Sequence, residues 1–161
     1  MSGIKAARFR WAPATQEDGR LLWSWRNDSL ARRNSLDSAK IPWTRHRRWL
    51  RKKLADRRCV ILIAKDGKRG PLGQLRLDLA GRRAAAVSIA VGKRFRGQGL
   101  AAEMLRRIPA DLAGRPLDRC IAYIKPDNIA SVVAFVKAGF EFRSLRRLKG
   151  SLMYRLEKRL R

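Results

Sequence analysis

Several residue types are scarce in this sequence, and each scarcity narrows the range of proteins it can encode. The 161 residues include two cysteines, one histidine and 13 acidic residues, against 39 lysines and arginines. Cys59 and Cys120 lie in apolar runs, so we expect buried thiols in strands rather than a disulfide or a metal site. No apolar segment approaches the length of a membrane-spanning helix, and the start MSGIKAARFRW lacks a signal-peptide core. These features predict a soluble, cytoplasmic protein.

The charge balance is strongly positive, with a formal net charge of +26. Such a charge attracts polyanions: phosphates, nucleic acid or a membrane surface. Arginine, the more frequent cation, also matches the geometry of phosphate groups. The cations are spread along the whole chain, with no lysine-rich tail. The pattern therefore fits a generally cationic, solvated surface, and it also fits a field that steers an anionic ligand.

The length predicts one domain, and the 45% hydrophobic content, with five tryptophans, is enough for a substantial core. Alternating and apolar segments predict strands at 7–11, 59–64, 72–80, 84–91 and 120–124, and two terminal strands joined near Lys149 and Gly150. Capping patterns predict helices from Thr15 through LLWSWRND, from Thr44, after RFRGQG to near Pro109, and from Asn128 to Gly139. The order of elements predicts an α+β, or mixed α/β, fold.

The segment RFRGQGLA, residues 94–101, connects an apolar strand to an apolar helix. A chain that enters a helix through glycines exposes backbone N–H groups at the positive end of the helix dipole, which suits an anion. Gly97 and Gly99 lack Cβ atoms that would keep a phosphate away, and Arg94 and Arg96 add positive charge. The segment matches neither a Walker loop nor a dinucleotide fingerprint. A glycine-rich turn before a helix can also be a tight strand–helix connection, which is the alternative explanation.

Two motifs resemble those of the GCN5-related N-acetyltransferase (GNAT) superfamily. RFRGQG has its pyrophosphate-binding pattern: Arg or Gln, two residues, Gly, one residue, then Gly or Ala. IKPDNIASVVAFVKAGFEF is similar to its C-terminal signature, in which an Asn opens a helix that ends in Lys-x-Gly-Phe. The resemblance covers about residues 59–158. It implies a GNAT fold, with a mostly antiparallel mixed sheet and a splayed parallel pair formed by strands 84–91 and 120–124.

The resemblance also implies acetyl-CoA as cofactor and one GNAT domain over residues 1–161. About 1–58 would form the acceptor side and 59–161 the cofactor-binding core. Asn128 could instead be a plain helix cap, and Phe135 fits a core position as well as a site. The implied cofactor-binding residues are Val91, Arg94, Arg96, Gly97, Gln98, Gly99, Leu100, Asn128, Ser131, Phe135 and Lys137.

The N-terminal third resembles sugar-nucleotide N-acetyltransferases, notably the enzyme that acetylates a UDP-4-amino sugar in pseudaminic acid synthesis. The resemblance rests on a pattern in this region: Trp-Arg-Asn, then Arg, Ser and Ile, then His-x-x-Trp. Ribosomal-protein N-terminal acetyltransferases share part of this pattern. Arginines can bind a diphosphate, and tryptophans can pack on a base or a sugar. Trp49 and His46 also fit structural roles on a helix. The candidate acceptor-binding residues are Trp25, Arg26, Asn27, Arg33, His46 and Trp49.

The expected reaction is direct attack of an amine on the thioester. The amine must lose a proton, and the developing oxyanion needs a donor, for which we expect the N–H of Val91 on a bulged strand. Two positions depart from the family pattern, since Phe135 and Ala86 stand where a Tyr and a Glu are common. The remaining candidates for proton transfer are Tyr123, His46, Tyr154 and Asp78, or a water-mediated route.

The predicted function is acetyl-CoA-dependent N-acetylation of a primary amine, with a nucleotide-linked amino sugar as the preferred acceptor. The alternatives are a protein N-terminus or another small amine, a non-catalytic acyl-CoA sensor, and a nucleic-acid-binding protein. A nucleic-acid-binding protein would need a clustered basic face and would not need the glycine loop, so nucleic acid is not the expected partner. The sequence leaves the oligomeric state open, a homodimer included.

Overall fold

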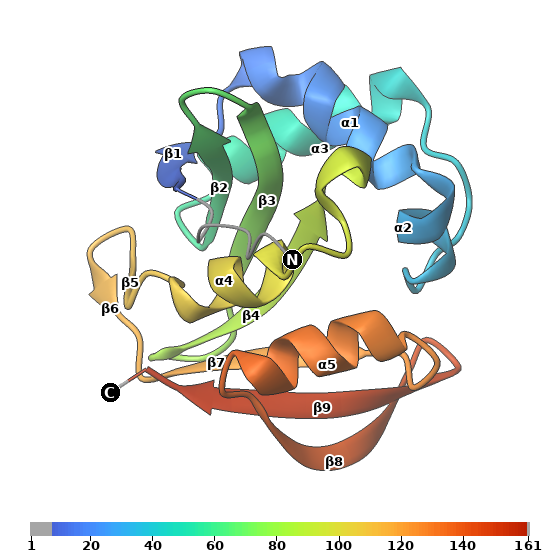
Figure 1. Ribbon diagram of the computed structural model, residues 1–161, viewed down its shortest axis with the longest axis vertical. Helices are drawn as coiled ribbons and strands as arrows, with labels where there is room; N and C mark the ends of the chain where they lie inside the picture. Colours follow the sequence, from blue (N-terminus) through green and yellow to red (C-terminus); the bar gives the residue numbers. More distant parts are fainter. Residues whose placement is uncertain (1–7, 161) are drawn as a thin grey trace, which may run out of the picture.

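The computed structural model describes residues 8–160, which build a seven-stranded mixed sheet in the order β1-β2-β3-β4-β7-β9-β8 (Figure 1). All neighbours are antiparallel except β4 and β7, which are parallel. The predicted mixed fold with one parallel pair is therefore confirmed. The strands of this sheet are β1 (Arg10–Pro13), β2 (Cys59–Asp66), β3 (Gly70–Leu79), β4 (Ala84–Val91), β7 (Arg119–Ile124), β8 (Glu141–Leu148) and β9 (Ser151–Arg159).

Helices cover both faces of the sheet, and the side-chain alternation of β2 shows why. Ile61 and Ile63 pack in one cluster with Leu22 and Leu50 of the N-terminal helices, whereas Leu62 points into the opposite cluster, which includes Phe135. Because β2 is buried on both faces, its sequence is a continuous apolar run, CVILIA. The helices are α1 (Gly19–Asn27), α2 (Ser29–Arg33), α3 (Trp43–Ala55), α4 (Leu100–Arg106) and α5 (Ile129–Lys137), with short 3-10 turns at Gln16–Asp18 and Lys93–Phe95.

Several predicted boundaries differ from the structure for local reasons. The first strand occupies Arg10–Pro13 rather than 7–11, because its pairing with β2 runs from Arg10 to Pro13; residue 7 lies outside the described residues. The helix expected to run through Asp28 stops at Asn27, since Asp28 is extended (ψ 137°) and caps α2 instead. A small hairpin of β5 (Asp111–Leu112) and β6 (Arg115–Pro116) was not predicted, because each strand has only two residues.

Within residues 8–160, no helix has the length and apolarity needed to cross a membrane. The same residues contain no cluster of three His, Cys, Asp or Glu side chains that could hold a metal ion. Both cysteine thiols are buried, and burial raises the pKa of Cys59 to about 12 and that of Cys120 to about 11. At neutral pH both are therefore protonated and poorly reactive.

Candidate active site

The parallel strands β4 and β7 diverge along their length. They pair only from Ala84 opposite Arg119 to Ala86 opposite Ile121, so the second half of β4 has no partner on that side. β7 remains paired with β9 over all six of its residues and departs from β4 together with it. Figure 1 shows the end of β4 pointing toward α1 while β7 runs beneath α5. The expected splay is present, and it opens at the carboxyl ends of the two strands.

Main-chain groups of β4 face this opening. The N–H of Gly92 donates to the carbonyl of Leu72 at 2.8 Å. Bonded and non-bonded pairs alternate along antiparallel strands, so Val91, which lies opposite Gly73, turns its N–H and C=O away from β3. Ile89, two residues earlier, has the same orientation. The backbone of β4 is therefore an open strand edge inside the sheet.

The bulge expected near Val91 is not present in β4. This strand keeps an unbroken register with β3 from Ala85 to Val91. The irregularity of the sheet's N-terminal half lies in the pairing of β2 with β3, where the register shifts between Ala64 and Lys65 and skips Leu72. The prediction was wrong because the divergence does not depend on β4. It arises where β7 leaves with β9, so β4 opens toward the site without any distortion.

The loop after β4 requires its glycines for backbone reasons. Gly97 and Gly99 have φ of +72° and +77°, in the left-handed region where side chains are strained, and Gly99 caps α4. A Cβ at either position would meet open space, so the outer surface of the loop is free. Arg94 is exposed there, and its carbonyl accepts from the Gln98 amide at 3.2 Å. Leu100 is buried and fixes the start of α4 to the core.

Arg96 is tied inside the protein rather than exposed on the loop. Its Nη2 lies 2.8 Å from the Asp28 carboxylate, and its Nε donates to the Val91 carbonyl at 3.2 Å. Asp28 also accepts from the N–H groups of Leu30 and Ala31, each at 3.1 Å. Partial burial raises the pKa of Asp28, but the hydrogen bonds from Arg96 and from the start of α2 outweigh it and lower the pKa below its usual value. One carboxylate thus links the loop after β4 to the start of α2.

The other end of α2 is tied to β7. Lys125, the residue directly after β7, donates from Nζ to the carbonyl of Arg33 at 3.0 Å. A cation at a helix C-terminus is favourable because the last carbonyls lack helical partners. The side chain of Arg33 is exposed. Five-residue α2 therefore spans the diverging strand ends, joined through Asp28 to the β4 side and through Lys125 to β7 (Figure 1).

The C-terminal motif builds one short helix and its anchor. The side-chain oxygen Oδ1 of Asn128 accepts from the Ser131 N–H at 3.3 Å and so caps α5, leaving the side-chain NH₂ outside the cap. Phe135 is 4% exposed and packs edge-on against Phe140 with ring centres 4.9 Å apart. Lys137 lies at the opposite end of α5 from Asn128 and is exposed. The structure therefore places Asn128 and Ser131 near the end of β7, Phe135 in the core and Lys137 far from Asn128.

Asn27 holds the connection before α3 in place. Its amide donates to the Ile41 carbonyl at 2.9 Å and accepts from the Ile41 N–H at 2.8 Å. The Trp23 indole donates to the same carbonyl at 2.7 Å. Both polar groups of the Asn27 side chain are used in this way. The Asn and the Ile of the predicted pattern thus have a structural explanation: with Trp23 they close the loop between α2 and α3 onto α1.

His46 and Arg26 each present a buried nitrogen that has no partner among the described residues. The His46 ring is 3% exposed and lies between Trp43 and Trp49, and its Nε2 makes no hydrogen bond. Arg26 donates from Nη2 to the Asp37 carbonyl at 3.0 Å, whereas its buried Nη1 makes none. Burial lowers the pKa of His46, and the charge of Arg26 lowers it further. His46 is therefore neutral at pH 7.

Polar residues of the central strands lie beneath these helices, and the sequence reading overlooked one of them. The Arg76 guanidinium lies 5.5 Å from the Trp49 ring centre and donates to the Asp78 carboxylate at 2.8 Å and the Ser88 hydroxyl at 3.3 Å. Alternation along LRLDL places Arg76 and Asp78 on one face, which was the available signal. Trp25 lies beside Gly92, with its indole nitrogen 3.4 Å from the position a Cβ would occupy there. Trp25 is thus next to the end of β4.

The candidates for proton transfer differ in their surroundings. Burial raises the pKa of Asp78, but Lys53, at 2.8 Å, and Arg76 lower it more, so the carboxylate stays ionised. Tyr123 is 39% exposed on the face of β7 opposite to the buried Ala122 and Ile124, and it pairs across the sheet with Arg155. Of the candidates, Tyr123 combines a phenol hydroxyl with exposure near the strand ends.

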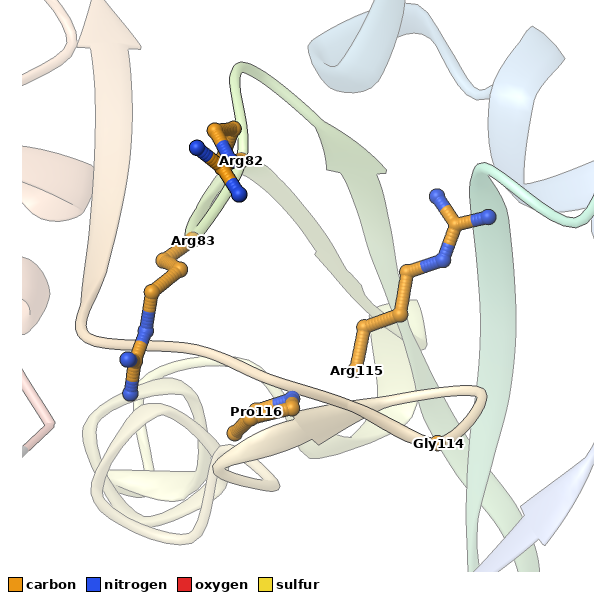
Figure 2. A pocket seen from close by; sticks show the side chains of 5 residues that line it. All are labelled: Arg82, Arg83, Gly114, Arg115 and Pro116. Carbon is orange, nitrogen blue, oxygen red and sulfur yellow. The ribbon is translucent and has the colours of Figure 1, made fainter.

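A separate open hollow of about 540 Å³ lies at the other end of the parallel pair. Figure 2 shows its lining, with Arg82 and Arg83 from the turn before β4 and Arg115, Gly114 and Pro116 from the β5–β6 hairpin. Arg83 is already paired with Asp118 at 2.8 Å. The hollow is thus remote from the diverging strand ends and from both motifs.

The fold and these strand ends define an acyltransferase class, and comparison with known proteins gives the family. A family model described as an acetyltransferase (GNAT) domain matches residues 8–141. The chain belongs to this family of acetyltransferases. The comparison with curated proteins produced no match.

Solved structures share the fold at low sequence identity. Aminoglycoside acetyltransferase AAC(6')-Ib, in complex with paromomycin and acetyl-CoA, superimposes with a TM-score of 0.80 at 16% identity, over 94% of this chain and 93% of that one. Spermidine N-acetyltransferase from Vibrio cholerae, with CoA and spermine, gives 0.82 at 14% identity, over 94% and 95%. The expected fold and enzyme class are confirmed, and neither neighbour is a sugar-nucleotide enzyme.

Proposed function

We propose that the protein transfers an acetyl group from acetyl-CoA to a primary amine on an acceptor that also carries negative charge, with a nucleotide-linked amino sugar as the first choice. The observation that carries the proposal is the open edge of β4. The N–H of Val91 faces the divergence from β7, directly before the Gly97–Gly99 loop. An extended amide-bearing arm fits beside such an edge because it can take the place of the missing strand.

The residues present fit the charged part of the cofactor as well. The free outer surface of Gly97 and Gly99, next to exposed Lys93 and Arg94, suits a diphosphate. Acetyl-CoA would supply an acyl group already activated as a thioester. Arg96 contributes indirectly, because its hydrogen bond to the Val91 carbonyl holds the loop against the end of β4.

The charges around the acceptor side favour an anionic rather than a polycationic acceptor. Two carboxylates there are already engaged in ion pairs: Asp28 with Arg96, and Asp78 with both Lys53 and Arg76. Arg26 keeps a buried N–H without a partner, and an unmet donor next to a site favours a ligand that brings an acceptor oxygen. A phosphate or carboxylate on the substrate provides that oxygen, whereas a second ammonium group is repelled.

The chain's own groups suggest how protons move. The N–H of Val91 is positioned as a donor to developing negative charge at the opening, as a backbone oxyanion donor must be. Tyr123 is our choice for the proton donor to the leaving thiolate, because Phe135 has no hydroxyl and is buried. Neutral His46 is too enclosed to reach solvent, so we assign it to positioning Trp49 and the acceptor. The proton that the amine loses passes to water at the opening, and water returns a proton to the Tyr123 phenolate.

A thiol-release assay with a panel of acceptors tests the proposal. Acetyl-CoA is offered with a UDP-4-amino sugar, a basic N-terminal peptide, spermidine and kanamycin, each at the same concentration. We expect kcat/KM to be highest for the nucleotide sugar and lowest for the two polycations. Preference for the peptide would redirect the acceptor to a protein N-terminus, and preference for spermidine or kanamycin would refute the anionic acceptor.

Gly97→Trp supplies the cofactor control and Gly114→Trp its match. Both glycines have positive φ, +72° and +81°, and open space at the Cβ position, so the backbone strain is similar. Only the first lies on the loop proposed to hold the diphosphate. We expect acetyl-CoA binding to be lost in Gly97→Trp and kept in Gly114→Trp; equal loss in both would show that strain, not a blocked site, is responsible.

A further inference from the structure

Helix α3 presents an outward half composed almost entirely of cations. Thirteen residues long, it carries six basic residues and no acidic one. Lys53 is paired with Asp78 beneath the helix. The other five are exposed, and none has an ion-pair partner among residues 8–160. We call them the α3 cations: Arg45, Arg47, Arg48, Arg51 and Lys52.

This arrangement is unfavourable for an isolated helix. Arg47 and Arg51, and likewise Arg48 and Lys52, are like charges four residues apart, and such pairs repel. Arg45 and Arg47 also lie near the positive end of the helix dipole, where acidic residues are favoured and none is present. Helix stability therefore does not explain this pattern of charges. A partner of opposite charge would relieve the repulsion between them.

The α3 cations are distinct from the candidate active site. The inner half of the helix carries His46, Trp49 and Leu50, which are buried or half-buried against α1 and the sheet. At 3.6 residues per turn, the α3 cations lie on the opposite half of the helix. A ligand at the diverging strand ends would contact the inner half, so these five charges are available to another molecule.

We propose that this outward half of α3 binds the sugar–phosphate backbone of a nucleic-acid duplex. From Arg45 to Lys52 the helix rises about 10 Å, a length over which a duplex carries about six phosphates. The face has no apolar side chain larger than Ala55 to insert into a lipid surface. It also lacks a free aromatic ring for stacking unpaired bases, because Trp43 is covered by Arg20, with the guanidinium 3.9 Å from the ring centre.

The test measures binding of the whole protein to a 20-base-pair duplex as a function of salt. The variant Arg45→Gln/Arg48→Gln/Lys52→Gln removes three α3 cations and keeps helix-forming residues. The matched control Arg82→Gln/Arg115→Gln/Arg146→Gln removes three exposed charges elsewhere. We expect the α3 variant to weaken binding about tenfold or more at 100 mM salt and to reduce the slope of log K against log salt by about 2–3.

Equal weakening by the two variants would overturn the proposal, because the attraction would then come from the total charge. Binding to anionic vesicles, polyglutamate or single strands that is as tight as to the duplex would overturn it as well. DNA and RNA duplexes are run in parallel to distinguish the two sources of the backbone. Thermal unfolding confirms that the α3 variant is folded, and we expect its Tm to be unchanged or higher, since repulsion is removed.

Discussion

The proposed cofactor side and the proposed acceptor side of this site are built in different ways. The loop proposed to hold the cofactor, residues 92–100, takes its shape from nearby residues, chiefly two glycines with positive φ and the start of α4. The acceptor side depends on distant contacts: Asn27 with Ile41, Asp28 with Arg96 and Lys125 with Arg33. Local geometry produces a short recognisable motif, whereas distant contacts do not. Variants that affect one side alone, or both together, should separate the two kinds of construction.

The largest expected effect tests whether Tyr123 acts where the two sides meet. Tyr123→Phe removes a phenol next to the strand ends, and we expect kcat to fall about 100-fold, within the range for a lost general acid, with little change in acetyl-CoA affinity. Steady-state kinetics and calorimetric binding measure the two quantities. The chain has one other tyrosine, Tyr154, which packs edge-on against Phe142. If Tyr154→Phe rather than Tyr123→Phe caused the loss, the donor would be reassigned.

Asn27→Ala should affect the acceptor side alone. The change leaves the N–H of Ile41 without its side-chain partner and the C=O of Ile41 with Trp23 alone, so we expect a loss of about 1–3 kcal/mol in the free energy of unfolding. We also expect the acceptor KM to rise about tenfold while the acetyl-CoA Kd stays constant. Urea unfolding and kinetics check both. Asn34→Ala, at the end of α2, is the matched control, and a similar loss there would contradict a specific clamp.

Asp28→Asn should affect both sides, because its carboxylate belongs to both. The substitution keeps a capping oxygen for α2 and removes the charge that binds Arg96. We expect the acetyl-CoA Kd and the acceptor KM each to rise about three- to tenfold, with no further rise when Arg96→Gln is added. Asp118→Asn breaks a comparable 2.8 Å pair with Arg83 outside the site and should change neither constant. A change confined to one constant would show that the two sides are independent.

The smallest expected effect concerns pH. The pKa of His46 is lowered in the folded protein, so between that value and about 6.5 the unfolded chain binds the extra proton. This contribution to stability is fully present above pH 6.5 and is lost as the pH falls below it. We expect the urea midpoint of the wild type to fall more steeply from pH 7.5 to 5 than that of His46→Gln. Parallel curves would mean that His46 is freely protonated in the folded state.

The sequence predicts this structure best where a signal is local, and least well where a residue's role depends on a distant partner. The alternation in β3 and the glycines around residues 97–99 predicted a strand and a loop that the structure contains. The sequence does not show that Asp28 pairs with Arg96, which lies 68 residues later. Nor does it show that α1 ends at Asn27, directly before Asp28. The prediction of a bulge in β4 was wrong for the same reason, because β4 and β7 diverge where β7 leaves β4 together with β9.

The sequence by itself determined the mixed fold, the two motifs and the excess of positive charge, because each depends on residue order over a few turns or on composition alone. Only the tertiary structure decided that Arg96 joins the Val91 carbonyl to the Asp28 carboxylate. It alone decided that Asn27 closes the loop before α3 and that His46 is enclosed between two tryptophans. It also decided that the N–H of Val91 is open, since this requires β7 to leave β4 after three paired residues. These outcomes depend on which segments pack together, and packing is set by the whole chain.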